Sequence, residues 1–215
     1  MDQKKISKSV LKRLPGYLAY LKNLPETAPD HISATALANA LGMGEVQVRK
    51  DLAMVSDGGR PKIGYLRESL VEDIEQFLGY DNTTDAVLIG AGKLGQALMA
   101  YSGFDEYGLN ILAAFDARPG QDKTDEGKPI YNISELAKFC RTHKVLMGII
   151  TTPAEAAQDV ADQLIAGGIK AIWNFAPTHL DVPANILVQN ENMATSLAVL
   201  SVHLQAQIKE EKKEM

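Results

Sequence analysis

Three glycines in the stretch VLIGAGKLGQAL constrain the fold of this chain more than any other feature. Gly90, Gly92 and Gly95 follow an apolar run and open a segment of helical character at G-x-G-x-x-G spacing. In such a unit the first glycine permits a tight turn, the second lets a pyrophosphate approach backbone N–H groups, and the third lets the helix pack on the strand. The stretch therefore predicts a dinucleotide-binding loop. The loop residues expected to contact the cofactor are Gly90, Ala91, Gly92, Lys93, Leu94 and Gly95.

The chain around this loop alternates short apolar runs with segments long enough for helices. The expected strands are AVLIG, NILAAFD, VLMGIIT and IKAIWNF. This alternation is typical of right-handed βαβ units around a buried parallel sheet, the Rossmann-type α/β arrangement. Asp116 closes the second strand, 21 residues after Gly95, where a carboxylate accepts hydrogen bonds from an adenosine ribose and repels a 2′-phosphate. Arg118 is either a surface residue or a receptor for such a phosphate, and NAD is favoured over NADP.

Two further segments follow strands at the same rim of the expected sheet. Thr152, Pro153 and Glu155 form a T-P-x-E capping box that would open a helix where the nicotinamide half of a dinucleotide lies. Asn174, Phe175, Ala176 and Pro177 end the next strand. From the residues alone, both segments either contact the cofactor or simply mark where a strand passes into a loop.

The first 80 residues have a different, helical texture that ends at the polar stretch LGYDNTTDA. The segment RLPGYLAYLKNL predicts a helix with Pro15 in its first turn and with Leu14, Tyr17, Leu18 and Leu21 on its apolar face. We place the domain boundary at residues 80 and 81, so that residues 1–80 form one domain, 81–188 the Rossmann domain and 189–215 a terminal helix.

The stretch HISATALANALGMGEVQVRKDLAMV predicts a helix-turn-helix. Ser33 can cap a first helix with Leu37, Ala38 and Leu41 inward, Gly42 ends it, and a second helix begins near Gly44 with Val48, Leu52 and Val55 inward. The glycine-rich stretch SDGGRPKIGYL predicts a wing hairpin. The alternative is a small helical oligomerisation domain with a solvated basic face. The residues expected to contact DNA are Ser33, Thr35, Gln47, Arg49, Lys50, Arg60 and Lys62.

Charge supports this division of the chain. The first 50 residues carry eight lysines and arginines against four acidic residues, a balance of +4, whereas the whole chain carries −5, so that the remainder carries −9. A basic segment on an otherwise acidic protein indicates a polyanionic partner at one end.

Several classes of protein are disfavoured by what the sequence lacks. The start MDQKKISKSV has no apolar stretch of a secretory signal, and no apolar run approaches the roughly 18 residues of a membrane span. The single cysteine, Cys140, cannot form an internal disulfide, and its helix-like context predicts a buried packing thiol. We therefore expect a cytoplasmic protein without membrane contact.

We expect no catalytic residues and no metal site. None of the four histidines stands in a recognisable relation to the glycine loop. Tyr101 lacks a lysine four residues on, because Asp105 stands there, so that a Tyr-Lys proton relay is missing.

The last segment carries an apolar stripe at three- and four-residue steps, which is typical of a helix that must be covered. It can fold back on its own domain or be covered by a partner. The stripe comprises Met193, Leu197, Leu200, Leu204 and Ile208.

From about Arg13 to Leu204 the chain resembles the bacterial redox-sensing transcriptional repressors of the Rex family. The resemblance rests mainly on TTPAEAAQDVADQL and GIKAIWNFAP, supported by KRLPGYLAYL, QVRKDL, IGYLRESL, LIGAGKLGQAL and YSGF. It implies a homodimer whose winged-helix domains bind a palindromic operator, with NAD or NADH in the Rossmann domain and an exchanged C-terminal helix. It also favours cofactor contact for Thr152, Pro153 and residues 174–177.

The resemblance implies a redox switch made of an arginine, a tyrosine and an Asp-Phe pair, matched here by Arg13, Tyr101, Asn192 and Met193. Asparagine replaces the aspartate, and the wing departs from the family pattern with Pro61 where an arginine falls. The interpretation is an NADH-responsive repressor that leaves its operator when NADH replaces NAD. The alternatives are a paralogous dinucleotide or coenzyme A sensor without tight operator binding, and an orphan Rossmann oxidoreductase.

Overall fold

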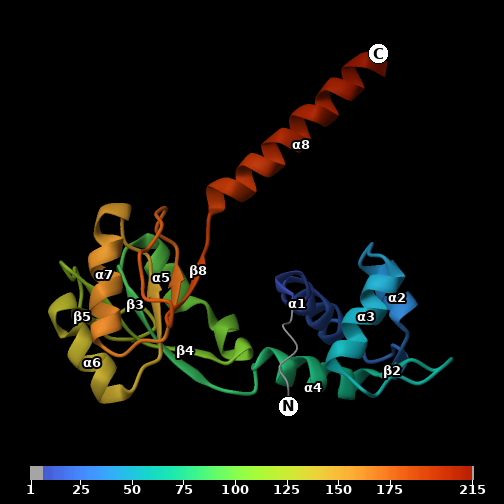
Figure 1. The fold of residues 1–215 in the computed structure, drawn as a ribbon, viewed down its shortest axis with the longest axis horizontal. Coiled ribbons are helices and arrows are strands. Elements are labelled where there is room, and N and C mark those ends of the chain that lie inside the picture. The colour runs from blue at the N-terminus through green and yellow to red at the C-terminus, as the bar shows by residue number, and fades with distance from the viewer. Residues whose placement is uncertain (1–6, 215) are drawn as a thin grey trace. The chain divides into compact units, whose positions relative to one another are not determined.

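The computed structural model describes residues 7–214, and it describes side chains as far as residue 211. The chain divides into two compact units, with the boundary between Asn82 and Thr83. Figure 1 shows the helices of the first unit and the sheet of the second, each of which is described by itself below.

The first unit is a small helical domain with a two-stranded ribbon. Its ribbon pairs β1 with β2 in antiparallel register, His31 opposite Leu66 and Ile32 opposite Tyr65. The buried core draws on every helix of the unit, with Leu14, Leu37, Leu52, Leu70 and Ile74 fully buried. The elements are α1 (Lys8–Lys22), β1 (His31–Ile32), α2 (Ala34–Ala40), α3 (Glu45–Val55), β2 (Tyr65–Leu66) and α4 (Arg67–Leu78).

The expected apolar face of α1 is confirmed, because Leu14, Tyr17, Leu18 and Leu21 are all buried. The expected position of Pro15 in the first turn is wrong. The helix begins earlier, at a cap in which the Ser7 hydroxyl accepts from the Val10 N–H, so Pro15 lies in its interior. Its missing N–H removes the bond that the carbonyl of residue 11 would accept.

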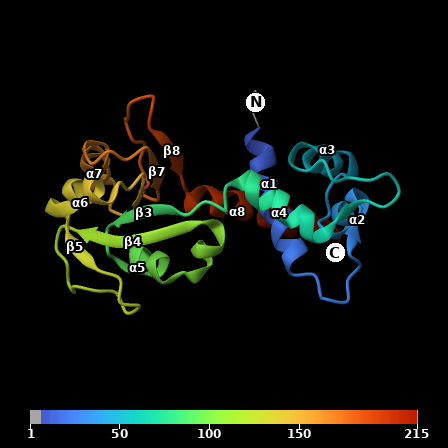
Figure 2. The same ribbon diagram turned by 90° about the horizontal axis from the view of Figure 1, so that it is seen from below.

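The second unit is built on a six-stranded sheet in the order β5-β4-β3-β6-β7-β8, with every neighbouring pair parallel. This is the doubly wound strand order, in which strands are added to one side of β3 as far as β5 and then, from β6 onward, to its other side. In such sheets ligands bind outside the carboxyl ends of the strands, where the two halves meet between β3 and β6. Figure 2 shows the sheet from a second side. The strands are β3 (Thr84–Ile89), β4 (Leu109–Asp116), β5 (Ile130–Asn132), β6 (Met147–Ile150), β7 (Ala171–Asn174) and β8 (Leu187–Asn190).

Helices cover both faces of this sheet. Val87, Ile89 and Phe115 pack with α6 and α7, whereas the alternate residues Ala86 and Leu88 pack with Met99 of α5 on the opposite face. Cys140 of α6 is fully buried in the first of these cores, which confirms its expected packing role. The helical elements are α5 (Lys93–Ala100), η1 (Ser102–Tyr107), η2 (Ile133–Glu135), α6 (Leu136–His143) and α7 (Ala154–Ala166).

The chain ends in the long helix α8 (Met193–Glu214), drawn in red in Figure 1. None of its described side chains is buried, so it does not fold back on its own domain. The stripe expected from the sequence is exposed over its whole length, from 67% at Met193 to 41% at Ile208. An exposed apolar stripe of this extent is typical of an interaction surface.

Candidate functional site

The three glycines of the loop between β3 and α5 each have a separate structural reason. Gly90 has φ +104°, and an added Cβ would lie 3.0 Å from the backbone of Thr151. A Cβ at Gly95 would overlap the carbonyl oxygen of Gly90. Among the described residues, no atom beyond the adjoining backbone lies within 4 Å of a Cβ added at Gly92, the N-cap of α5, and no side chain caps the helix there. Gly90 and Gly95 therefore serve the fold, whereas Gly92 leaves open space at a helix N-terminus.

The carboxylate of Asp116 lies at this loop. Its Oδ2 accepts from the backbone N–H of Ala91 at 2.8 Å, and its Oδ1 accepts from the N–H of Arg118 at 2.8 Å. The side chain is half-buried at the end of β4, beside the strand that leads into the loop. A negative charge thus stands where the sequence placed a ribose-binding group, and Arg118 is exposed.

The segment that follows β6 differs from the expected capping box. Helix α7 has Pro153 as its N-cap and no side-chain cap, because the helix begins one residue later than a threonine cap would require. The Thr152 hydroxyl is buried without a hydrogen-bond partner among the described residues. Thr151, which the sequence did not single out, donates from its hydroxyl toward the carbonyls of Ile89 at 3.0 Å and Gly90 at 2.8 Å. It therefore links β6 to the glycine loop.

Asn174 at the end of β7 is a fully buried hub. Its Nδ2 donates to the carbonyl of Thr178 at 3.0 Å and to Oδ1 of Asn190 at 2.9 Å, and its Oδ1 accepts from the N–H of Ala176 at 3.0 Å. The backbone carbonyl of Asn174 also accepts from the N–H of Glu191 at 2.8 Å. Asn174 thus shapes the loop of residues 174–178 and ties it to the segment before α8.

A row of aromatic rings runs from Tyr101 to the same rim. Tyr101 and Phe104 have ring centroids 4.9 Å apart, and Phe104 and Trp173 follow at 5.7 Å, both pairs edge to face. The ring centroids of Trp173 and Phe175 are 4.8 Å apart, and Nε1 of Trp173 donates to the carboxylate of Glu191 at 3.0 Å. A cavity of about 290 Å³ lies beside this junction, lined by residues 176–179 and 190–192.

The helix-turn-helix of the first unit is confirmed in its main features. Ser33 caps α2 by accepting from the N–H of Ala36 at 3.0 Å, and Gly42 in the turn has φ +63°. Val48 and Leu52 of α3 are fully buried. The outward residues of α3 are exposed as expected, and Arg49 pairs with Glu45 one turn earlier. The exposed candidates on these helices are Ser33, Thr35, Gln47, Arg49 and Lys50.

The wing is a tight hairpin. Arg60 and Gly64 exchange two backbone hydrogen bonds of 2.9 Å each. Lys62 occupies the tip with φ +65°, a left-handed conformation that is uncommon for a residue with a side chain. Arg60 and Lys62 are both exposed, so the hairpin presents two cations to solvent.

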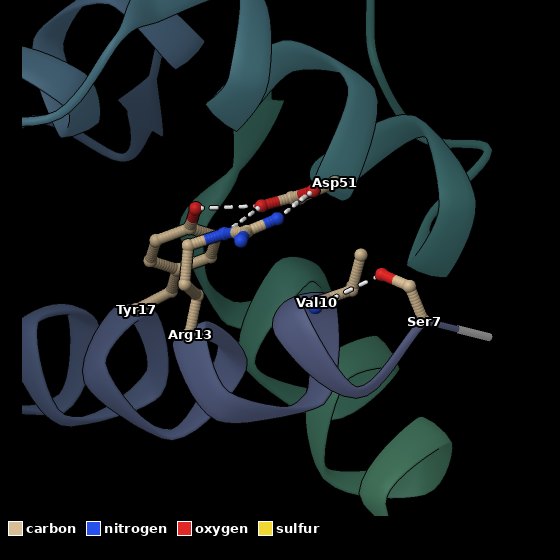
Figure 3. A network of polar contacts seen from close by, with 5 residues as sticks. All are labelled: Ser7, Val10, Arg13, Tyr17 and Asp51. Carbon is tan, nitrogen blue, oxygen red and sulfur yellow. Dashed lines mark hydrogen bonds and ion pairs between the residues drawn. The ribbon is translucent and has the colours of Figure 1, made fainter.

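A charged network that the sequence did not reveal connects α1 with α3 (Figure 3). Arg13 donates from Nε to Oδ2 of Asp51 at 2.7 Å and from Nη2 to Oδ1 at 2.9 Å, while the Tyr17 hydroxyl donates to Oδ2 at 2.8 Å. The paired carboxylate raises the pKa of Arg13, and burial with the hydrogen bond to Asp51 raises the pKa of Tyr17 to about 12. Asp51 itself is only 3% exposed.

Two features are absent from residues 7–214. No cluster of histidine, cysteine and acidic side chains there could hold a metal ion. No helix in the same part of the chain is long and apolar enough to cross a membrane.

Two family models match the chain, one in each unit. Residues 5–53 match a model described as a putative DNA-binding protein N-terminus, and residues 81–178 match one described as a CoA binding domain. Solved structures of a Rex-family repressor called RSP are similar over nearly the whole chain. The complex with NAD+ and operator DNA gives a TM-score of 0.88 at 32% identity, covering 99% of this chain and 98% of that one. The complex with NADH gives 0.84 at 32% identity, covering 98% and 99%.

Curated relatives are closer in sequence. The redox-sensing transcriptional repressor Rex of Porphyromonas gingivalis is 42% identical over 197 residues, which covers 91% of this chain and 90% of that protein. The Rex of Clostridium botulinum strain Alaska E43 is 41% identical over 211 residues, covering 96% and 100%. Identity at this level over almost the full length of both proteins shows that the chain belongs to the Rex family of redox-sensing transcriptional repressors.

Proposed function

We propose that this chain is an NADH-responsive transcriptional repressor that binds a palindromic operator as a homodimer and leaves it when NADH replaces NAD. The observation that carries the proposal is the likeness, over 99% of this chain, to a Rex-family repressor solved with NAD+ and operator DNA. In this proposal residues 1–80 bind DNA, residues 81–188 hold the cofactor and residues 189–215 form the dimer helix. The protein acts in the cytoplasm, where operator and cofactor occur together.

The residues of the second unit fit a bound dinucleotide. The space at Gly92 is one that a Cβ would fill, and it lies at the N-terminus of α5, where backbone N–H groups attract a pyrophosphate. Within the part of the chain that the structure describes, the buried Thr152 hydroxyl lacks a hydrogen-bond partner, and a ligand at the rim would supply one. The cofactor contacts are the loop of residues 90–95 together with Asp116, Arg118, Thr152, Pro153 and residues 174–177.

Asn174 has a different place in this proposal from the one expected. Its amide is fully engaged within the fold, so it acts by shaping the loop that faces the nicotinamide. Because the same residue holds Asn190 and the N–H of Glu191, a change in this loop reaches the start of α8. The switch residues of the second unit are Tyr101, Asn192 and Met193.

In the first unit, α3 and the wing supply the DNA contacts. Gln47, Arg49 and Lys50 project from a helix whose opposite face is buried, as in a recognition helix. Arg60 and Lys62 project from the hairpin and suit a phosphate backbone or a minor groove. Ser33 and Thr35, at the start of α2, suit phosphate contacts.

A coenzyme A sensor is the second candidate, favoured by the family model that matches residues 81–178. Coenzyme A carries a phosphate on its adenosine ribose, and the carboxylate of Asp116 beside the loop would repel it. We therefore place NAD and NADH first.

Titration of a palindromic duplex with saturating NAD or NADH, at several salt concentrations, tests the proposal. The expected result is tighter operator binding with NAD than with NADH, and binding that weakens with salt because phosphate contacts release counterions. Equal operator affinities with the two cofactors, or a response to coenzyme A alone, would overturn it.

A further inference from the structure

The side chain of Gln47 on α3 lies against the guanidinium of Arg13 on α1. With its amide oriented so that donors meet acceptors, Oε1 of Gln47 accepts from Nη1 of Arg13 at 2.9 Å and from Nε at 3.1 Å. The same guanidinium holds Asp51, one turn further along α3. All three nitrogens of the Arg13 fork are therefore engaged on a single face of α3.

This arrangement fixes the guanidinium firmly. The side chains of Arg13 and Asp51 are only 17% and 5% exposed, and their two parallel hydrogen bonds have the fork geometry that arginine forms with carboxylates. Tyr17 supplies a third bond to the same carboxylate. A fixed guanidinium fixes, in turn, which end of the Gln47 amide it contacts.

The chemistry that Gln47 can present to DNA follows from this contact. A free glutamine pairs with adenine through both ends of its amide, the oxygen accepting from N6 and the nitrogen donating to N7. Here the oxygen is occupied by Arg13, so the exposed end of the side chain offers only the two N–H donors of Nε2. In the major groove, guanine presents two acceptors, O6 and N7, and cytosine presents a donor.

We propose that Arg13 is a positioning residue for base recognition, which holds Gln47 as a donor-only reader that selects guanine over adenine at one position of each operator half-site. The inference rests on the proposed function, in which α3 enters the major groove. It gives Arg13 a task within the DNA-binding unit that is separate from any switch with the second unit.

The test measures base preference position by position. A palindromic duplex is selected with the wild-type protein in the presence of NAD, and each half-site position is then varied through the four bases in binding assays with purified variants. In the wild type, one position prefers guanine to adenine by about tenfold. Gln47→Ala flattens the preference at that position alone.

Two variants separate positioning from simple loss of charge. Arg13→Lys keeps a cation beside Asp51, but an ammonium group lacks the planar fork that holds both α3 side chains, so the Gln47 oxygen is released and the preference moves toward adenine. Gln47→Glu keeps an acceptor toward Arg13 and presents an acceptor outward, so the preference moves toward cytosine. Gln47 is exposed, so Gln47→Glu gives a result even if Arg13→Lys fails to fold.

Lys22→Met is the matched control, because it removes another ion pair of α1, the 2.6 Å contact with Glu75 of α4. We expect it to leave every base preference unchanged. A uniform loss of affinity over all sequences in Arg13→Lys, together with an unchanged pattern in Gln47→Glu, would overturn the inference. Failure of the wild-type protein to prefer any duplex over random DNA would instead overturn the proposed function.

Discussion

Asp116 accepts a hydrogen bond of 2.8 Å from the backbone N–H of Ala91, which places a carboxylate within the glycine loop. The two residues lie on neighbouring parallel strands or just beyond them, so the sheet itself brings them together. An anion fixed here favours a ribose with free hydroxyls and disfavours one that carries a phosphate.

We expect NADH to bind far more tightly than NADPH. Asp116→Ala should weaken NADH binding by roughly 10- to 100-fold, because a hydrogen bond to a charged group contributes about 1.5–3 kcal/mol. The same change should narrow the ratio between the two cofactors. Isothermal titration calorimetry with both cofactors measures this. Equal affinities for NADH and NADPH in the wild type would mean that Arg118 governs the pocket.

The glycine loop offers a paired experiment. Gly95→Ala should lower Tm by roughly 5–10 °C, because its Cβ would overlap the carbonyl oxygen of Gly90. Gly92→Ala should cost at most about 1 kcal/mol of stability, since no atom of the described residues beyond the adjoining backbone lies within 4 Å of the added Cβ. It should nevertheless weaken NADH binding at least about tenfold. Thermal melts measure the stability of both variants, and calorimetry measures their affinity for NADH. A Gly92→Ala protein with wild-type NADH affinity would show that no phosphate approaches there.

Cations on α3 should affect DNA binding in two different ways. Lys50→Ala should weaken all sequences similarly and reduce the salt dependence by about one unit of slope, as expected for one phosphate contact. Arg49→Ala should cost about 1–3 kcal/mol on the operator if Arg49 leaves Glu45 to read a guanine. Salt titrations on operator and random duplexes separate these effects. Binding that ignores both changes would contradict the assignment of α3.

Because of Cys140, the stability of the second unit should change with pH in the alkaline range. Burial raises the pKa of its thiol from 9 to about 11. Between those values the unfolded chain has lost the proton that the folded chain keeps, so its contribution is fully present below pH 9 and is lost as the pH rises toward 11. Chemical denaturation at pH 8 and pH 11 should show a smaller loss of stability in Cys140→Ala than in the wild type. The thiol should also resist alkylation at pH 7 until the protein unfolds.

Asn192 accepts from the N–H of Thr195 at 3.1 Å in the first turn of α8, a bond that aspartate can also accept. Asn192→Asp should therefore keep the helix start while adding the charge that the family resemblance implies. We expect the ratio of operator affinities with NAD and NADH to increase, because a charge-assisted bond is roughly twice as strong as a neutral one.

Adding Arg13→Ala to the Asn192→Asp variant should abolish the increase in the ratio of operator affinities with NAD and NADH. An unchanged ratio in Asn192→Asp, or an equal gain without Arg13, would remove this residue from the switch. The measurement is operator binding by the wild type, both single variants and the double variant with each cofactor.

Local signals in the sequence were enough for much of the fold. Buried strands leave apolar runs, and all four expected runs form strands, whereas no apolar run predicts β5 or β8. Both lie at the edges of the sheet; β5 has three residues, and most side chains of β8 are exposed, so neither leaves a long apolar run. The helix-turn-helix was recognisable because its cap, its turn glycine and its apolar spacing are local features.

Interactions between distant residues were not predictable in this way. Asp51 and Arg13 are 38 residues apart in the sequence, and Thr151 and Gly90 are 61 residues apart. No local sequence pattern therefore predicts either contact. The predicted capping box is wrong because α7 begins one residue later than the box requires, which leaves Thr152 outside the cap. The engagement of Asn174 also depends on β8, a strand that the sequence did not reveal.

Trp173 is the single tryptophan of the chain, and it lies between the aromatic row from Tyr101 and the carboxylate of Glu191 before α8. Indole emission overlaps the absorption band of reduced nicotinamide, which the oxidised ring lacks. The protein therefore contains its own optical donor beside the rim where the two cofactors would differ. Quenching of this fluorescence by NADH, with sensitised emission from the dihydronicotinamide, would follow the reduced state alone and would need no attached label.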